Sequence, residues 1–189
     1  MNRNFLTPAI ALTVLIIFGY FYYQYTVREN RPGENRFRMA NKYLEDGNYE
    51  EALRVFDEVI AGYPEYKDAY MSRAITLMQM QEFEKSRRDF DRALTLDKNF
   101  AAAYANRGIL NDRTGNYREA VSDYRKAAEL NPDLAEGPGW LWRFLRNIPE
   151  RPPTISDRAD YIEAELKKPQ AERLLSVPEI DEQQRMYKK

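Results

Sequence analysis

The chain of 189 residues has no cysteine and no histidine. Without cysteine there are no thiol nucleophiles or disulfides, and without either residue type most zinc and haem ligand sets are missing. The absence of histidine also removes the usual general base near neutral pH. An enzyme would have to use carboxylates and lysines. We find no convergent base, nucleophile and phosphate-binding loop, and we expect no enzymatic activity, no cofactor and no metal site.

An excess of charge of either sign is also missing. The chain holds 29 Lys and Arg against 30 Asp and Glu, a formal net charge of −1. Proteins that bind nucleic acid commonly carry a positive patch or a strong positive balance. Nucleic acid is therefore not the expected ligand. Acidic pairs such as Asp89 with Asp91 fit a solvated helix face better than a catalytic site.

One long stretch lacks charge altogether. The segment from Phe5 to Tyr23 is almost entirely apolar or aromatic. At about 1.5 Å per residue, a helix of this length spans the roughly 30 Å of a bilayer core. We predict a transmembrane helix within an N-terminal anchor, residues 1–30. The alternative is a cleaved signal peptide, but the run is too long and no small-residue cleavage site precedes Arg28.

The charges on either side of this segment give conflicting signals about its orientation. Only Arg3 precedes it, whereas several arginines follow it closely. These are Arg28, Arg31, Arg36 and Arg38. Because Lys and Arg favour the cytoplasmic side, we predict a single-pass protein of a bacterial inner membrane with the rest of the chain in the cytoplasm. A short tail with one arginine is also typical of signal anchors, which would place the rest in the periplasm.

The rest of the sequence is organised by a pattern that occurs three times, with a step of 34 residues. Two sets of aromatic residues and one set of small residues keep this step. The sets are Tyr49, Phe83 and Tyr117; Ala52, Ser86 and Ala120; and Phe56, Phe90 and Tyr124. A period of this length predicts a solenoid rather than a single folded core.

Within each repeat, apolar residues fall at helical spacing in two stretches separated by a short turn. The turns are Asp46-Gly47-Asn48, Gln81-Glu82 and Thr114-Gly115-Asn116. Each unit is therefore predicted to be a helix pair. The three repeats cover residues 33–66, 67–100 and 101–134.

This pattern resembles the tetratricopeptide repeat. The residues that carry the resemblance are Tyr49, Ala52, Phe56 and Pro64 in the first repeat and Tyr104, Gly108, Tyr117, Ala120, Tyr124 and Pro132 in the third. The second repeat departs from the pattern at Ser86 and Lys98, and Arg73 and Arg107 stand where the family usually has leucine. The resemblance implies an all-α, right-handed solenoid of stacked antiparallel helix pairs, whose first helices line a concave groove.

The same resemblance implies which side chains line the groove. Carried over position by position, the predicted partner-binding residues are Phe37, Asn41, Leu44, Met71, Ile75, Met78, Asn106 and Ile109. Asp112 falls on a further inward position. Most of these side chains are apolar and methionine adapts to varied partners, so we expect an apolar or amphipathic protein segment as ligand. The alternative is that the groove receives another part of this chain.

Some members of the family hold the terminal carboxylate of a peptide with Lys, Asn and Arg side chains. Of those positions only Asn41 matches here. The others hold Phe37, Ser72, Ala102 and Asn106. We therefore do not expect this chain to bind an acidic chain end.

The 34-residue register ends in a Gly-Pro-Gly stretch, and dense aromatic residues follow. We predict a capping helix over residues 135–148, in which Trp140, Leu141 and Phe144 cover the third repeat. Trp142 is a candidate second contact for a partner, because aromatic residues are enriched in binding hot spots.

Residues 149–189 form a helical arm interrupted by prolines. Within the arm, Thr154 and Asp157 have the spacing of a capping box. The helix that they start carries Ile155 and Ile162 on one face. The arm either folds back along the solenoid or binds a partner by itself.

Together these features predict a non-enzymatic scaffold that recruits or assembles protein partners at a membrane. Attachment to a membrane would raise the effective concentration of a membrane-associated partner. The alternative function is a stably integrated accessory subunit of a membrane enzyme complex.

Overall fold

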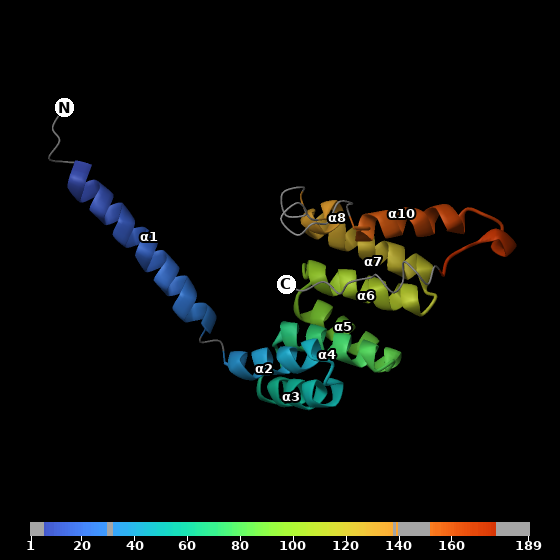
Figure 1. The fold of residues 1–189 in the computed structure, drawn as a ribbon, viewed down its shortest axis with the longest axis horizontal. Coiled ribbons are helices and arrows are strands. Elements are labelled where there is room, and N and C mark those ends of the chain that lie inside the picture. Colours follow the sequence, from blue (N-terminus) through green and yellow to red (C-terminus); the bar gives the residue numbers. More distant parts are fainter. Residues whose placement is uncertain (1–5, 30–31, 138, 140–151, 177–189) are drawn as a thin grey trace.

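The computed structural model describes residues 6–29, 32–137, 139 and 152–176, and every regular element in these ranges is a helix (Figure 1). The elements are α1 (Leu6–Glu29), α2 (Glu34–Glu45), α3 (Tyr49–Gly62), α4 (Lys67–Gln79), α5 (Phe83–Leu96), α6 (Ala101–Arg113), α7 (Tyr117–Leu130), the four-residue α8 (Asp133–Glu136), α10 (Ile155–Leu166) and the 3-10 helix η1 (Gln170–Glu172).

Helices α2 to α7 form three pairs, α2 with α3, α4 with α5 and α6 with α7. The pairs are stacked one upon the next in chain order (Figure 1). Each pair lies within one of the 34-residue repeats of the sequence. The predicted all-α solenoid of helix pairs is confirmed.

The turn inside each pair uses a left-handed residue at one fixed repeat position. Gly47 and Gly115 adopt φ angles of 76° and 77°, and Gln81 adopts a φ of 62° at the same position of the second repeat. Glycine takes this conformation without steric cost, whereas a residue with a Cβ atom takes it only at a steric cost. The three turns therefore share one backbone geometry although their sequences differ.

The two helices of a pair pack closely because small residues face aromatic ones. Phe56, Phe90 and Tyr124 on the second helices are almost completely buried. A Cβ atom on Gly108 would lie 2.6 Å from the Tyr124 ring, so this position of α6 requires glycine. In the second repeat, Ser86 donates a hydrogen bond of 2.7 Å to a carbonyl oxygen of α4, which satisfies its buried hydroxyl.

The helix α10 ends the stack by packing along α7 (Figure 1). Ile155 and Ile162 are buried there and join the main core. The predicted capping box is confirmed, since Thr154 accepts from the Asp157 amide at 3.3 Å and Asp157 accepts from the Thr154 amide at 2.8 Å. Residues 152–176 of the arm thus fold back onto the solenoid. Of the predicted capping helix, residues 135–137 and 139 are described, and of these only residues 135 and 136 are helical, at the end of α8. Trp140, Leu141, Trp142 and Phe144 lie outside the described residues.

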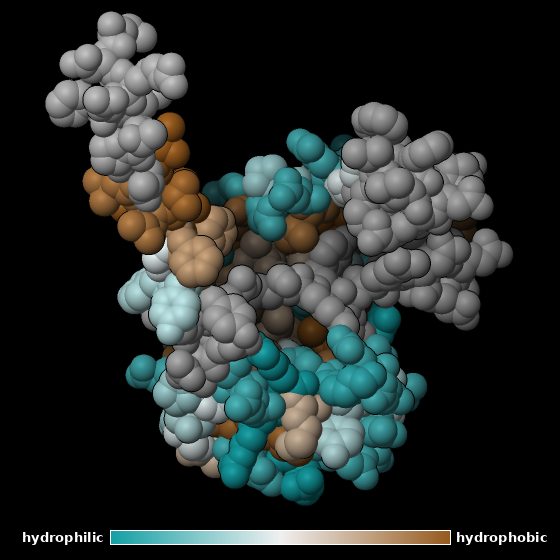
Figure 2. Space-filling model, turned by 60° about the vertical axis from the view of Figure 1, so that its left-hand side comes forward, coloured by the Kyte–Doolittle hydropathy of each residue, from teal (hydrophilic) through white to brown (hydrophobic). Residues whose placement is uncertain are grey.

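The first helix, α1, stands apart from the stack (Figure 1). Its described side chains from Ile10 to Tyr23 are all exposed, and Figure 2 shows hydrophobic residues gathered on this helix above a mainly hydrophilic solenoid. Among the described residues, however, no helix is long and apolar enough to cross a membrane. The predicted transmembrane helix is therefore not supported.

A physical reason lies in the make-up of α1. Thr7 and Thr13 interrupt the aliphatic residues of α1. Gly19 lies further along the helix, and three of the next four residues are tyrosines, namely Tyr20, Tyr22 and Tyr23. The tyrosine hydroxyls prefer the wet edge of a membrane to its interior.

We predict that Phe90→Ala lowers the free energy of unfolding by about 3 to 5 kcal/mol, because it leaves a cavity at the centre of the middle repeat. Urea unfolding followed by circular dichroism measures the change. Arg88→Ala on the exposed side of the same helix is the control, with an expected effect within about 0.5 kcal/mol. Equal stability of the two variants would contradict the prediction.

Candidate functional site

The predicted partner-binding residues, called here the groove positions, are Phe37, Asn41 and Leu44 on α2, Met71, Ile75 and Met78 on α4, and Asn106 and Ile109 on α6. The three positions on α2 are half-buried. The five on α4 and α6 are buried, with exposed fractions of at most 6%. Only the α2 end of the set is open to solvent in the structure.

Aromatic packing shapes the α2 end. The ring centroid of Phe37 lies 5.0 Å from that of Tyr66 and 6.0 Å from that of Phe56. The side-chain amide of Asn41 donates a 3.1 Å hydrogen bond to the Phe37 carbonyl oxygen. These side chains are held in place by their own helix pair, and they present a half-open apolar surface.

Contacts between repeats organise the α4 and α6 positions. The Asn106 side-chain amide donates to the Ala102 carbonyl oxygen at 2.9 Å and lies 3.9 Å from the Met71 sulfur atom. Ile75, Met78 and Ile109 belong to the same buried cluster as Met71. The apolar groove positions of α4 and α6 therefore belong to one continuous buried cluster across two repeats.

The positions at which the resemblance would place a carboxylate clamp carry no positive charge. Ser72 and Ala102 are buried, and Asn106 directs its amide to its own helix and to Met71. A peptide carboxylate needs Lys or Arg donors for strong binding. Phe37 and these three positions supply none.

The two arginines that depart from the family pattern hold the repeats together. Arg73 on α4 donates to Asp57 on α3 at 2.6 Å and to both carboxylate oxygens of Asp89 on α5, at 2.6 and 2.7 Å. The hydrogen bond to Asp89 is the main reason that the pKa of Arg73 is raised above its ordinary value. Asp89 is thus a partner in a structural ion pair.

The same arrangement recurs one repeat later. Arg107 on α6 donates to Asp91 on α5 at 2.7 Å and to both oxygens of Asp123 on α7, at 2.9 and 2.7 Å. The arginines, and both sets of aspartates, are 34 residues apart. The ion pairs could therefore have been predicted from this 34-residue register of arginines and aspartates in the sequence.

The third repeat reverses the charge. Arg125 stands 34 residues after Asp91, and it pairs with Asp160 at 2.5 Å and Glu163 at 3.0 Å, both on α10. If a further repeat followed, an arginine at the repeat position of Arg73 and Arg107 would lie beside the positive charge of Arg125. The end of the stack is therefore suited to the acidic face of α10.

A buried ion pair joins α10 to α6. The Arg158 guanidinium donates to both carboxylate oxygens of Asp112, at 2.7 and 2.8 Å, and the two side chains are only 5% and 3% exposed. The Tyr124 hydroxyl lies 3.3 Å from the same carboxylate. Asp112 stands where the first two repeats have Leu44 and Met78, so a charged residue at an apolar repeat position was the signal in the sequence.

The chain after η1 is tied back to α10 through residues 173–176, called here the strap. The Leu174 amide donates to Glu165 at 2.8 Å, and the Leu174 carbonyl oxygen accepts from the Tyr161 hydroxyl at 2.7 Å. Arg158 also donates to the Leu175 carbonyl oxygen at 2.9 Å. One arginine thus connects α6, α10 and the strap.

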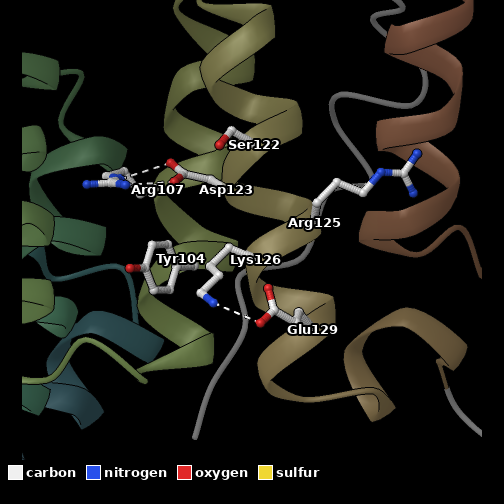
Figure 3. A pocket seen from close by; sticks show the side chains of 7 residues that line it. All are labelled: Tyr104, Arg107, Ser122, Asp123, Arg125, Lys126 and Glu129. Carbon is white, nitrogen blue, oxygen red and sulfur yellow. Dashed lines mark hydrogen bonds and ion pairs between the residues drawn. The ribbon is translucent and has the colours of Figure 1, made fainter.

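A separate polar cleft of about 450 Å³ lies between α6 and α7 (Figure 3). Its lining residues are Tyr104, Arg107, Ser122, Asp123, Arg125, Lys126 and Glu129. Each cation in it is paired with a carboxylate: Arg107 with Asp123, Lys126 with Glu129, and Arg125 with the acidic face of α10. We assign the cleft to the structural ion pairs.

Comparison with known proteins agrees with this architecture. Two family models, both described as the tetratricopeptide repeat, match residues 43–107 and 101–134. Residues 43–134 of this chain are therefore similar to the tetratricopeptide repeat. The matched residues include α3 and both later helix pairs. They also include the ion pairs between repeats, Arg73 with Asp57 and Arg107 with Asp91.

Among the relatives, a DnaJ homolog subfamily C member 7 homolog of Dictyostelium discoideum is 30% identical over 124 residues, which are 64% of this chain and 22% of that protein. Human tetratricopeptide repeat protein 12 is 32% identical over 108 residues, 57% of this chain and 15% of that protein. The chain therefore spans less than a quarter of either relative.

Solved structures show the same fold. The TPR2B domain of yeast Sti1, solved as a complex with pHsp70, aligns with a TM-score of 0.56 at 20% identity, covering 71% of this chain and 98% of that one. The first such domain of Spaghetti, bound to the HSP90 peptide SRMEEVD, aligns with a TM-score of 0.52 at 24% identity, covering 61% and 89%. At these identities the likeness establishes the fold alone.

We predict that Arg158→Met destabilises the chain by about 3 to 5 kcal/mol, because it leaves the Asp112 carboxylate buried without its cation. Urea unfolding measures the change. The double variant Asp112→Asn with Arg158→Met should recover most of the loss. Arg125→Met, at an exposed ion pair on the same helix interface, is the control and should cost about 1 kcal/mol or less. A similar cost for both single variants would contradict a special role for the buried pair.

The strap should respond to acid. The hydrogen bond from the Leu174 amide, and after it the hydrogen bond from the Lys168 side chain, lowers the pKa of Glu165 below its ordinary value of 4.5. The ionised Glu165 carboxylate accepts the hydrogen bond from the Leu174 amide. The contribution of this bond to stability is therefore complete above the ordinary pKa and is lost as pH falls through the lowered pKa. The Leu174 amide resonance should therefore titrate with a midpoint below 4.5 in an NMR series. A midpoint at or above that value would count against the bond.

Proposed function

We propose that this chain is a non-enzymatic scaffold that binds an apolar or amphipathic segment of a partner protein along the groove positions. The support is the continuous apolar cluster of Met71, Ile75, Met78 and Ile109, together with the half-open aromatic end at Phe37. A stack of helix pairs presents such a surface without a deep enclosed cavity, which suits an extended or helical peptide.

The observation that carries the proposal is the absence of positive charge at Phe37, Ser72, Ala102 and Asn106. The neighbouring Spaghetti domain is described as bound to the HSP90 peptide SRMEEVD, whose end is acidic. Bringing such a carboxylate against neutral, buried positions would remove its hydration without an ionic partner. The ligand class proposed for this chain therefore differs from that of this neighbour.

We further propose that α1 holds the chain at a membrane surface, at the inner membrane of a bacterium, with the repeats on the cytoplasmic side. The support is the exposure of its described apolar side chains, which lie between 50% and 71% for residues such as Ile10, Leu15 and Phe18. Exposed apolar patches of this kind commonly mark interaction sites. Stable integration into a membrane enzyme complex is the alternative, and it predicts stoichiometric co-purification through a salt wash.

We predict that the full chain binds the peptide SRMEEVD with a Kd weaker than about 1 mM, because no cation faces the terminal carboxylate. Fluorescence anisotropy with a labelled peptide measures this. The variant Ala102→Lys with Asn106→Arg restores two cations of the clamp and should bind more tightly than the natural chain. Micromolar binding by the natural chain would overturn the proposed ligand class.

A photoreactive amino acid in place of Leu44 should crosslink the partner, since Leu44 lies at the half-open end of the groove. The matched control carries the same group in place of Arg54, which is exposed on α3. We expect the Leu44 variant, and not the Arg54 variant, to label a partner. The labelled peptide of the partner should be rich in apolar residues. Labelling of this chain only, in cells that contain its natural partners, would contradict the recruitment function.

A further inference from the structure

We propose that residues 177–189 of this chain occupy the groove positions of α4 and α6 when no partner is bound, so that the protein carries a competitor of its own ligand. The inference rests on the proposed function, because it assigns a resting occupant to the same groove. Four observations support it: the place where the strap ends, the apolar surface that it joins, the length of the remaining chain and the composition of that chain.

The strap directs the chain toward α6. Arg158 binds the Asp112 carboxylate on α6 and the Leu175 carbonyl oxygen at the same time, at 2.7 and 2.9 Å. Glu165 and Tyr161 fix Leu174 from both sides of its peptide unit. Because Asp112 lies one turn beyond Ile109 on α6, the chain leaves Ser176 beside the groove positions of that helix.

The apolar surface is continuous from the strap into the groove. Leu175 packs against the same buried cluster that contains Met71, Ile75, Met78 and Ile109. An apolar segment that follows Leu175 can therefore extend this contact without crossing a polar surface. The Arg158–Asp112 pair neutralises the charge at the point of entry.

The remaining chain is long enough. Residues 177–189 number thirteen, and at about 3.3 Å per extended residue they reach roughly 43 Å. Helices of packed neighbours lie about 10 Å apart, so the distance from α6 to α2 across the groove is on the order of 20 Å. The segment can span all three repeats.

The composition of the segment suits the groove. It carries Val177, Ile180, Met186 and Tyr187 among charged residues, which makes it an amphipathic peptide of the proposed ligand class. It also contains Lys188 and Lys189. The neutral positions Ser72, Ala102 and Asn106 do not repel these lysines.

The first test uses a fluorescent peptide with the sequence of residues 177–189 and two forms of the protein, the full chain and a chain that ends at Ser176. The shorter chain keeps α10, the strap and the Arg158–Asp112 pair. We expect the peptide to bind the shorter chain and to bind the full chain about 10- to 100-fold more weakly, because the tethered segment competes at high effective concentration. A peptide with Ile180→Asp and Met186→Asp should lose binding. No binding to the shorter chain, or equal binding to both chains, would overturn the inference.

The second test locates the segment in the full chain. Because the chain has no cysteine, Tyr187→Cys accepts a single benzophenone label. Irradiation followed by mass spectrometry should give intramolecular crosslinks to Met71–Met78 on α4 or to Asn106–Ile109 on α6. Crosslinks to α3 or α5, or only between two chains, would contradict the proposed site.

The two proposals fail separately. If the Leu44 photoprobe captures a partner but the peptide of residues 177–189 does not bind, the scaffold function stands and the resting occupant is wrong. If that peptide binds the shorter chain but the photoprobe labels this chain alone, the groove serves the protein internally and recruitment is wrong.

Discussion

Every helix pair in this protein leaves one apolar flank uncovered, and the structure depends on covering that flank with the next pair. Phe90 and Tyr124 fill the space within their own pairs, while Arg73 joins the second pair to Asp57 of the first and Arg107 joins the third pair to Asp91 of the second. Packing supplies most of the stability, because apolar burial outweighs ion pairs that remain partly exposed. The arginine pairs specify the register in which successive repeats meet.

Stacking of this kind has to stop somewhere, and the third repeat is built to stop it. Arg125 replaces the aspartate of earlier repeats and selects the acidic face of α10. Asp112 replaces an apolar residue and receives Arg158 from the same helix. The glycine at position 108 admits Tyr124, whose hydroxyl reaches Asp112. These departures from the repeat pattern act together to end the stack with a helix of different sequence.

The end of the stack and the groove are therefore physically connected. Arg158 secures the end helix, neutralises Asp112 and holds the strap that leads toward the groove positions. A partner that displaces a segment of the chain from the groove would meet a competitor anchored at one end by a buried ion pair. In the resting state proposed above, this anchoring would raise the effective concentration of the competing segment at the groove.

The sequence by itself determined the helix pairs, their turns and the Thr154 capping box, because these depend on interactions between residues close in the chain and on a repeat that occurs three times. The apolar character of the groove was also readable from the family pattern. The tertiary structure decided how the arm folds, which groove positions are open and which arginine meets which aspartate. Arg158 and Asp112 are 46 residues apart, and their pairing depends on how α10 packs against α7 rather than on any local spacing. The sequence also predicted a membrane span from the length and apolar character of the Phe5–Tyr23 stretch, whereas no described helix is long and apolar enough to cross a membrane.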